Sequence, residues 1–262
     1  MPLQPSPELD KVQPFSQFRE NVELGFKKML DSYNKSLKTK ITEDDLKLIE
    51  DKMREMTNSN EVYVGIRFKI NDLEKILADG RFKSQFETRT SGGYFNDVLR
   101  ADMENTAMGY GIKSTKPKDR PIYGMLFDGK TPSDIKASDE YMRSGCYGSV
   151  VAIFKPEIKR YATVGFGDSL MQKNMVLLPL LNPSRYSMPS ERPIFIEIKN
   201  LAKAGELKPS QFKKIRYAEV QIHGGQATVS NIDRIIFARN TPKEKIPVNE
   251  LKKYGVKWEM EK

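Results

Sequence analysis

The sequence has very few residues of the kinds that build disulfide frameworks, zinc sites and membrane spans. Its 262 residues include one cysteine, Cys146, and one histidine, His223. A lone cysteine forms no internal disulfide, so a reducing compartment is expected, and most structural zinc sites need more such ligands. The longest apolar run, Met175–Leu181, is interrupted by Pro179 and is far shorter than the roughly 20 residues of a transmembrane helix. We therefore expect no bound metal and no membrane partner.

Two motifs are also missing from the chain. No Gly-x-Ser-x-Gly nucleophile elbow occurs, which removes the best-known signature of serine hydrolases. The first 14 residues carry prolines at positions 2, 5, 7 and 14 and show no basic segment followed by an apolar one. We therefore expect residues 1–14 to be a flexible leader and not a cleavable secretory signal.

The composition is that of a soluble globular protein with a basic surface. Hydrophobic residues make up 38% of the chain and charged residues 30%, and the net charge is +9. Such a charge suits nucleic acid, a membrane surface or an anionic cofactor. Because the Lys and Arg residues are spread along the chain, a solvated basic surface is favoured over a nucleic-acid groove.

Hydrophobic periodicity divides the chain after the leader into two parts. Residues 15–58 read as a helical lobe of two helices, the second starting at Thr42 with Asp45 as its capping partner. Residues 59–262 form the larger domain, in which helices and strands are mixed. The predicted fold class is therefore α+β, with one or two mainly antiparallel sheets behind a helical lobe.

The larger domain begins with a clearly alternating strand, Glu61–Lys69, and a short helix that Asn71 and Glu74 are expected to cap. A helix from Tyr94 to Met108 follows. The remaining predicted strands are Ile122–Asp128, Tyr147–Lys155, Ala162–Phe166, Pro193–Lys199, Arg216–His223 and Ile232–Arg239, and a helix and a strand follow Pro247.

Arg67 is the first residue that could carry chemistry. The alternation places Val64 and Ile66 in the core, so Arg67 lies on the opposite face beside the small Gly65. A guanidinium on a rigid strand can bind a phosphate through two parallel hydrogen bonds. From this strand alone, a solvent-facing arginine is the favoured interpretation.

The second candidate is the hydroxyl-rich segment Thr88-Arg-Thr-Ser-Gly-Gly93. Its hydroxyls can orient a ligand, and its paired glycines let the backbone approach closely. The more common meaning of such a string is a polar loop that caps the next helix.

The third candidate, Tyr217–Gly225, is the most informative segment. A period of two places Tyr217, Glu219, Gln221 and His223 in one row, with Val220 and its apolar neighbours packed behind them. A solvated outer face is the alternative, because alternation does not say which side faces water.

Two lesser features favour ordinary structure. Gly165-Phe-Gly-Asp-Ser169 lacks the lysine and the spacing of a phosphate loop and is interpreted as a turn. Arg100 and Glu104 stand four residues apart on a predicted helix, where they are expected to pair with each other.

An arginine on the first strand, a hydroxyl-rich segment and a glutamate on a late strand occur in that order, at Arg67, Thr90-Ser91 and Glu219. This order resembles the Arg–Ser–Glu pattern of the ADP-ribosyltransferase superfamily over roughly residues 61–240. The segments Phe86–Gly93 and Tyr217–Gly225, with Asp168-Ser169, are similar to bacterial type III effectors that attach ADP-ribose to a threonine of host ubiquitin. They are also similar to ADP-ribosyltransferase-like domains of phage head-morphogenesis proteins.

The resemblance implies an ADP-ribosyltransferase-like core and a substrate, NAD, with no metal. Arg67 would hold the NAD phosphates, and Thr90 and Ser91, with the backbone at Gly92, would position the ribose next to nicotinamide.

By the same resemblance, Tyr94 or Phe95 would stack near the nicotinamide, and Glu219 would be the catalytic carboxylate. Gln221 is counted with the cofactor-binding residues, and orienting the acceptor is its alternative role. The superfamily motif usually ends on the catalytic Glu, whereas the order here is Glu219-Val220-Gln221. Either the carboxylate stands two residues earlier on the same face, or the alignment is shifted.

The leading hypothesis is therefore a mono-ADP-ribosyltransferase that acts on a host protein, with ubiquitin as the implied acceptor, as a secreted bacterial effector in the host cytosol. One alternative is a phage-type head or assembly component without NAD turnover. A basic nucleic-acid-binding module is a weaker alternative, because no nucleic-acid motif is recognisable. Hydrolysis of NAD without an acceptor would use the same site.

Overall fold

The structure, a computed structural model, describes residues 3–7, 9, 15–36, 40–91, 96–128, 147–170, 177–187, 192–211 and 218–261. Within these ranges, the side chains of residues 15–22, 187, 192 and 193 are not described. The helices are α1 (Phe15–Ser36), α2 (Glu43–Asn58), α3 (Leu73–Asp79), α4 (Gln85–Thr88), α5 (Asp97–Met108), α7 (Arg192–Ala204) and α8 (Val248–Lys253). The strands are β1 (Tyr63–Phe68), β2 (Ile122–Phe127), β3 (Val150–Phe154), β4 (Ala162–Phe166), β5 (Leu178–Pro179), β6 (Ala218–Ile222), β7 (Ile232–Phe237) and β8 (Lys257–Met260).

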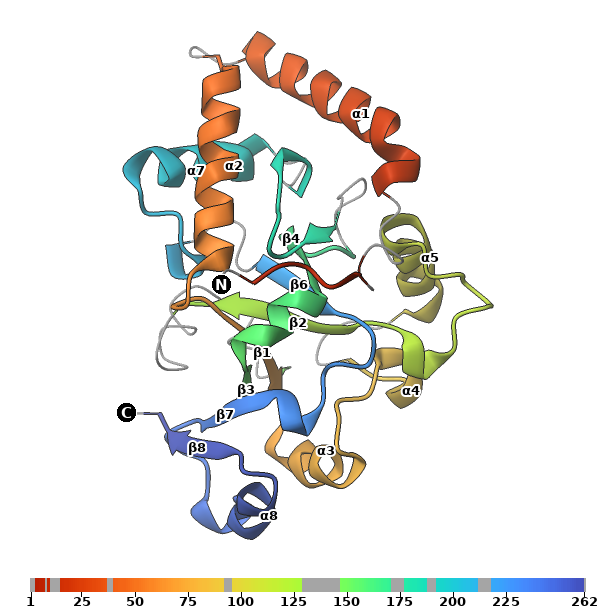
Figure 1. Cartoon of the computed structure of the whole chain (residues 1–262), viewed down its shortest axis with the longest axis vertical. Coiled ribbons are helices and arrows are strands. Elements are labelled where there is room, and N and C mark those ends of the chain that lie inside the picture. The colour runs from red at the N-terminus through yellow and green to blue at the C-terminus, as the bar shows by residue number, and fades with distance from the viewer. Residues whose placement is uncertain are drawn as a thin grey trace.

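All eight strands join one sheet in the order β5-β4-β6-β2-β1-β3-β7-β8 (Figure 1). Every neighbouring pair is antiparallel except β7 and β8, which are parallel. Helices combined with a mostly antiparallel sheet confirm the predicted α+β class. The predicted strands at 122–128, 147–155, 162–166 and 232–239, and the last helix and strand, are also confirmed, each within a few residues.

The strand register defines which side chains share a face. Met125 of β2 pairs with both Gly65 of β1 and Glu219 of β6, and Glu219 pairs with Gly165 of β4. Paired residues point to the same side of a sheet, and so do residues two apart on one strand. Arg67, Tyr123, Thr163, Glu219 and Gln221 therefore lie on one face, which we call the site face.

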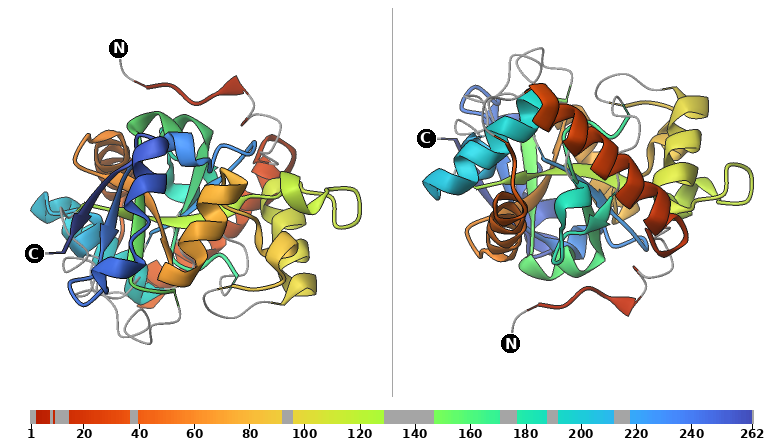
Figure 2. Two further views of the ribbon diagram at one scale, coloured as in Figure 1. Left: turned by 90° about the horizontal axis from the view of Figure 1, so that it is seen from below. Right: turned by 90° about the horizontal axis from the view of Figure 1, so that it is seen from above.

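The opposite face of the sheet holds the main apolar core. Val64, Val164 and Val220 are each at most 1% exposed there, and buried residues of α2, α3, α7 and α8 pack in the same cluster. In Figure 1, α2 and α7 lie on one side of the strands and α5 on the other, and Figure 2 shows the same separation from two further directions. The apolar core therefore lies on the opposite face of the sheet, and α5 covers the site face near β6.

Polar contacts at both ends fix α2 in place. The expected capping box at its start is confirmed, because Thr42 and Asp45 exchange hydrogen bonds. Asp45 also forms ion pairs with Lys199 and Lys203 of α7, at 2.9 and 2.7 Å. At the other end, the buried Lys159 donates to the carbonyls of Thr57 and Ser59. The buried apolar residues of α2 belong to the same cluster as those of the strands, so the second helix of the predicted helical lobe shares one core with the sheet.

Part of the N-terminal leader lies against the rest of the protein. Ser6 N donates to Arg160 O at 2.8 Å, and Leu9 is 1% exposed. Residues 1, 2, 8 and 10–14 of the predicted leader lie outside the described residues.

Two sequence predictions are wrong in their local structure. Pro193–Lys199 was expected to be a strand but falls in α7, because Ile194, Ile198 and Ala202 are buried at helical spacing. The capping box expected from Asn71 and Glu74 does not form, since a short 3-10 helix over Ile70–Asp72 leads directly into α3. Gly80 does end α3, as expected, in the left-handed conformation with φ 67°.

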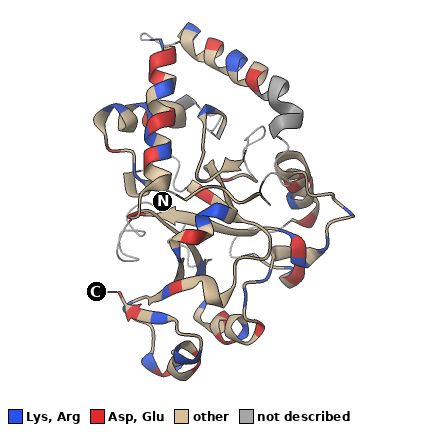
Figure 3. Cartoon of the chain, viewed as in Figure 1, with Lys and Arg blue, Asp and Glu red and all other residues tan. Residues whose placement is uncertain are grey.

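Acidic and basic residues are interspersed on the described elements. Along α2 they alternate at close spacing (Figure 3), which fits the expectation of a solvated surface more than a single basic block. Among the helices that the structure describes, none has the length and apolar character needed to cross a membrane.

Candidate functional site

Helix α5 covers the site face next to β2. Its N-cap is Asn96, whose side chain accepts a hydrogen bond from Leu99 N, and its C-cap is Gly109, with φ 73°. The guanidinium carbon of Arg100 lies 4.3 Å from the centre of the Tyr123 ring. Tyr123 is paired across the strands with Gln221. The helix therefore brings a cation over the strand beside Glu219.

Glu219 is buried, with 4% of its surface exposed. Its Oε1 accepts hydrogen bonds from Ser169 Oγ and, at 2.7 Å, from Gln221 Nε2. Ser169 belongs to the turn after β4, in which Gly167 has φ 119° and Asp168 Oδ1 accepts from Leu170 N. The segment interpreted as a simple turn therefore places a hydroxyl directly on the candidate catalytic carboxylate.

A chain of hydrogen bonds leads away from Gln221. Thr163 Oγ1 donates to Gln221 Oε1 at 2.8 Å and lies 2.8 Å from His223 Nε2. The other ring nitrogen, Nδ1, lies 2.8 Å from the hydroxyl of Tyr110, whose ring stacks on the imidazole. These contacts confirm the predicted row of Glu219, Gln221 and His223. Tyr217, its fourth member, lies outside the described residues.

The surroundings of Glu219 shift its pKa far from the ordinary value of a carboxyl group. Burial raises its pKa to about 7; the positive charge of Arg100 opposes that rise and the negative charge of Asp168 adds to it. Burial also lowers the pKa of His223 to about 3, so the imidazole is neutral near pH 7. Glu219 therefore changes its charge within the physiological pH range, a property that is common at catalytic sites.

The helical spacing suggested that Arg100 pairs with Glu104, but the two residues do not pair. Glu104 instead accepts from Arg120 Nη1 at 2.6 Å and from the Tyr123 hydroxyl at 2.9 Å. Arg100 is 5% exposed, and its Nε and Nη1 have no hydrogen-bond partner among the described residues. Burial opposes its charge, but Tyr123 and Glu219 hold the pKa of Arg100 above its ordinary value. A buried guanidinium with unused donors can bind an anionic group by donating hydrogen bonds to it.

Arg67 lies on the site face, as predicted, at a different strand from Glu219. Their strands are separated by β2, which corresponds to about 10 Å across a sheet. The ladder between β1 and β2 ends at Gly65 and Met125, so Arg67 stands just beyond the last pair. A Cβ on Gly65 would come within 2.6 Å of the Phe127 ring. A side chain at position 65 would therefore collide with this ring, and glycine leaves the room that the ring needs beside β1.

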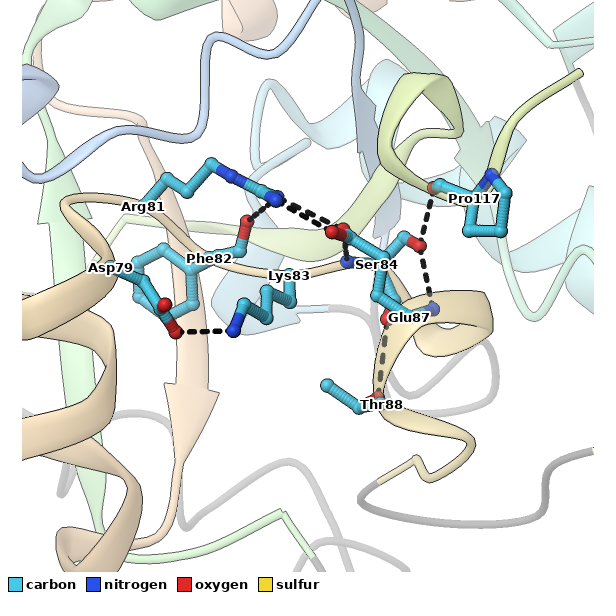
Figure 4. Close-up of polar contacts among 8 residues, drawn as sticks. All are labelled: Asp79, Arg81, Phe82, Lys83, Ser84, Glu87, Thr88 and Pro117. Carbon is cyan, nitrogen blue, oxygen red and sulfur yellow. Dashed lines mark hydrogen bonds and ion pairs between the residues drawn. The ribbon is translucent and has the colours of Figure 1, made fainter.

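The hydroxyl-rich segment is anchored by α4 (Figure 4). Arg81 binds Glu87 through two hydrogen bonds, at 2.9 and 2.5 Å. Ser84 forms a capping box with Glu87 and donates to Pro117 O at 2.7 Å. Thr88 Oγ1 donates to Ser84 O. These contacts fix the start of the loop that joins α4 to α5.

The predicted ribose-binding hydroxyls follow on that loop. Arg89 takes the left-handed conformation, with φ 57°, and Thr90 is exposed and bonded through its backbone to Thr88. Ser91 is half-buried. The predicted residues Gly92, Tyr94 and Phe95 lie outside the described residues.

Sequence reasoning missed two members of this site, Thr163 and Tyr110, and undervalued two others, Arg100 and Ser169. The alternation of β4 could have indicated the face on which Thr163 lies, whereas no local pattern singled out Tyr110. Arg100 was interpreted only as a partner of Glu104, and Ser169 only as part of a turn. Among the described residues, no group of three or more His, Cys, Asp or Glu side chains is placed to hold a metal ion.

Comparisons with known proteins give two relatives of low identity. The chain is 27% identical to the "Gene 2 protein" of Mycobacterium phage D29 over 207 residues, which cover 72% of this chain and 69% of that protein. It is 26% identical to the "Gene 2 protein" of Mycobacterium phage L5 over 231 residues, 81% of this chain and 77% of that protein. No protein-family model matches the chain. The chain is thus similar to proteins that mycobacteriophages encode.

Proposed function

We propose that this protein is a mono-ADP-ribosyltransferase with an ADP-ribosyltransferase-like core, which cleaves NAD and transfers ADP-ribose to a protein. The observation that carries the proposal is Glu219. It is a buried carboxylate with a pKa of about 7, held by neutral donors on the same sheet face as Arg67. A structural carboxylate at such a depth is normally paired directly with a cation.

The chemistry suits a fixed carboxylate. Breaking the bond between nicotinamide and ribose sends the bonding electron pair to nicotinamide and leaves an oxocarbenium-like centre on the ribose, as in glycoside hydrolysis. The ionised Glu219 would stabilise that centre and accept a hydrogen bond from a ribose hydroxyl. A nucleophilic oxygen of the acceptor protein then bonds to the ribose carbon and releases its proton to solvent.

Two guanidinium groups fit the anionic part of NAD. Arg67 stands at the end of the β1–β2 ladder and is assigned to the phosphates. Arg100 keeps two donors without partners among the described residues, so it is a second group that an anion can bind. Thr90, Ser91 and Gly92 are assigned to the ribose beside nicotinamide.

The remaining roles follow the same proposal. Tyr94 or Phe95 would stack near the nicotinamide, and Gln221 holds the catalytic carboxylate through its amide. Because Glu219 is only 4% exposed, substrate reaches it when Ser169 gives up its hydrogen bond and the Gly167–Leu170 turn moves. Closure of such a turn over the substrate would exclude water from the reaction.

The proposed acceptor is a protein, and a threonine of host ubiquitin is the first one to test. Secretion as a bacterial effector into a host cytosol is one proposed setting. A phage-encoded enzyme that modifies proteins of its bacterial host is favoured over it by the two relatives, which are phage proteins.

The same relatives favour one second candidate function, a phage assembly component without NAD turnover. It predicts association with phage particles or self-assembly. It gives no role to a carboxylate that titrates near pH 7.

Transfer of label from biotinylated NAD tests the proposal. Wild type and Glu219→Ala would be incubated with bacterial lysate, host-cell lysate or purified ubiquitin as separate acceptors. We expect a labelled band with wild type alone, and its mass would identify the acceptor. No label and no consumption of NAD would contradict the proposal and favour the assembly component.

A further inference from the structure

Gln221 stands between Glu219 and a second group of buried side chains. An amide has one end that donates and one end that accepts, so its orientation decides what a neighbouring carboxylate meets. Here Nε2 faces Glu219 at 2.7 Å and Oε1 accepts from Thr163. The reversed amide would aim its carbonyl oxygen at Glu219 and would repel the ionised form.

Thr163 has one hydroxyl proton, and it is used on Gln221. The contact of Thr163 with His223 Nε2 therefore requires that the imidazole donates from Nε2. Since His223 is neutral, with its pKa lowered to about 3 by burial, its Nδ1 carries no proton. Nδ1 must then accept from the hydroxyl of Tyr110, which lies 2.8 Å away.

We infer that Tyr110, His223 and Thr163 are positioning residues that lock the amide of Gln221 in one orientation and thereby hold Glu219 ready for the reaction. Every bond in the chain runs in the same direction, from Tyr110 through His223 and Thr163 to Gln221 and Glu219. The consequence for catalysis rests on the proposed function. The direction of the hydrogen bonds does not depend on that function.

The geometry supports a positioning role over simple packing. Thr163 and Gln221 are 0% exposed and His223 is 3% exposed, so water does not replace a lost partner easily. The series of hydrogen bonds starts after α5, includes a residue of β4 and ends on β6. These three segments are 50 or more residues apart in sequence. A purely apolar set of the same shape would fill this space without polar groups to satisfy.

Other charged groups also act on Glu219 and set the background for the test. Arg100 from α5 opposes its protonation, and Asp168 from the turn after β4 favours it. The Tyr123 hydroxyl from β2 faces the same cluster. Because Thr163 is uncharged, changing it alters the orientation of the amide and leaves these charges in place.

The tautomer of His223 tests the direction of this series of hydrogen bonds without any enzyme assay. The protein has one histidine, so ¹⁵N-labelled histidine in the full chain gives a single pair of ring signals. We expect the neutral form protonated on Nε2 at pH 5, where an ordinary imidazole is mostly charged. A proton on Nδ1, or a charged ring at pH 5, would overturn the inference.

Thr163→Val and Thr163→Ser test the consequence for catalysis. Valine keeps the shape but lacks the hydroxyl, whereas serine keeps the hydroxyl. We expect Thr163→Val to lower the kcat of nicotinamide release from NAD about 10- to 100-fold, with little change in KM. Its pH–rate profile should also shift to higher pH, because the freed amide favours protonated Glu219. Thr163→Ser should recover both the rate and the profile.

Equal rates and profiles for wild type, Thr163→Val and Thr163→Ser would contradict the inference. Matching melting temperatures of the two variants would show that the comparison is between folded proteins. A wild type that releases no nicotinamide, but whose His223 is protonated on Nε2, would contradict the proposed function and leave the chain of hydrogen bonds standing.

Discussion

Two buried carboxylates on the same side of the sheet, Glu104 and Glu219, are treated in opposite ways. Glu104 is 0% exposed and is bound directly by the guanidinium of Arg120 and the hydroxyl of Tyr123. Glu219 is 4% exposed and is bound by an amide and a hydroxyl, both neutral. Burial raises the pKa of both carboxyl groups. Only Glu104 has a cation in direct contact to offset that cost.

The difference matches the structural role assigned to Glu104 and the catalytic role proposed for Glu219. The contact between the Glu104 carboxyl and the Arg120 guanidinium opposes the effect of burial and holds α5 to the turn before β2. A carboxylate left with neutral donors is costly to ionise, and such costs are found where a protein uses the group in chemistry. Glu104 therefore shows how a buried carboxylate on this side of the sheet is held when a cation contacts it directly.

The largest expected effect is on activity. Glu219→Gln should lower NAD cleavage about 1000-fold, because it removes the negative charge that stabilises the oxocarbenium-like centre while keeping the side-chain shape. Steady-state release of nicotinamide measures it. Glu157→Gln, an exposed change on the 3-10 helix Pro156–Tyr161, is the matched control and should keep the wild-type rate.

The next largest effect is on stability, at the other carboxylate. Arg120→Met should lower the free energy of unfolding by about 3–5 kcal/mol, since it leaves Glu104 buried without its cation. Combining it with Glu104→Leu should recover much of that loss. Chemical denaturation of the three proteins checks both expectations.

An exposed ion pair calibrates that result. Arg185 binds Glu43, whose side chain is 74% exposed, and Glu43→Gln should change stability by no more than about 1 kcal/mol. If Arg120→Met costs equally little, the buried pair does not have the structural role assigned to it.

A third effect concerns stability and pH at Glu219. Its carboxyl titrates near pH 7 in the folded protein and near 4.5 when unfolded, so the folded state holds an extra proton between these values. The stabilisation is complete below pH 4.5 and is lost as pH rises through 7. Glu219→Gln does not titrate, so its stability relative to wild type should rise by up to about 3 kcal/mol from pH 4.5 to 8. Unfolding curves that keep a constant difference across that range would contradict the raised pKa.

Apart from the calibrating Glu43→Gln change, the smallest effect is on NAD binding. Arg67→Ala should weaken NAD affinity about 10- to 100-fold by removing phosphate hydrogen bonds, and Arg67→Lys should recover part of it. Calorimetric titration with NAD measures both. An unchanged affinity would remove Arg67 from the site without affecting the assignment of Glu219.

The sequence predicted the faces of the strands better than the groups that meet on them. Alternation alone placed Arg67 opposite Val64 and put Glu219, Gln221 and His223 in one row, because period two is a local property of a strand. It did not predict that Tyr110 contacts His223, 113 residues later in the chain. No local pattern contains such a pairing.

Two errors have the same physical origin. Arg100 and Glu104 have the right spacing for a helical pair, but Glu104 binds Arg120 from outside the helix instead. In α7, Ile194, Ile196 and Ile198 fit a strand, yet packing buries Ile194 and Ile198 at helical spacing and leaves Ile196 half-buried. Tertiary packing decided both cases where the local pattern allowed two answers.

The most direct test of the role of Glu219 measures nicotinamide released from NAD by wild type, Glu219→Gln and Glu157→Gln between pH 5 and 9. We expect release by wild type and Glu157→Gln, rising with pH through about 7 as Glu219 ionises, and almost none by Glu219→Gln. Equal release by Glu219→Gln and wild type, or none by any of the three proteins, would contradict the assignment of Glu219 as the carboxylate that cleaves NAD.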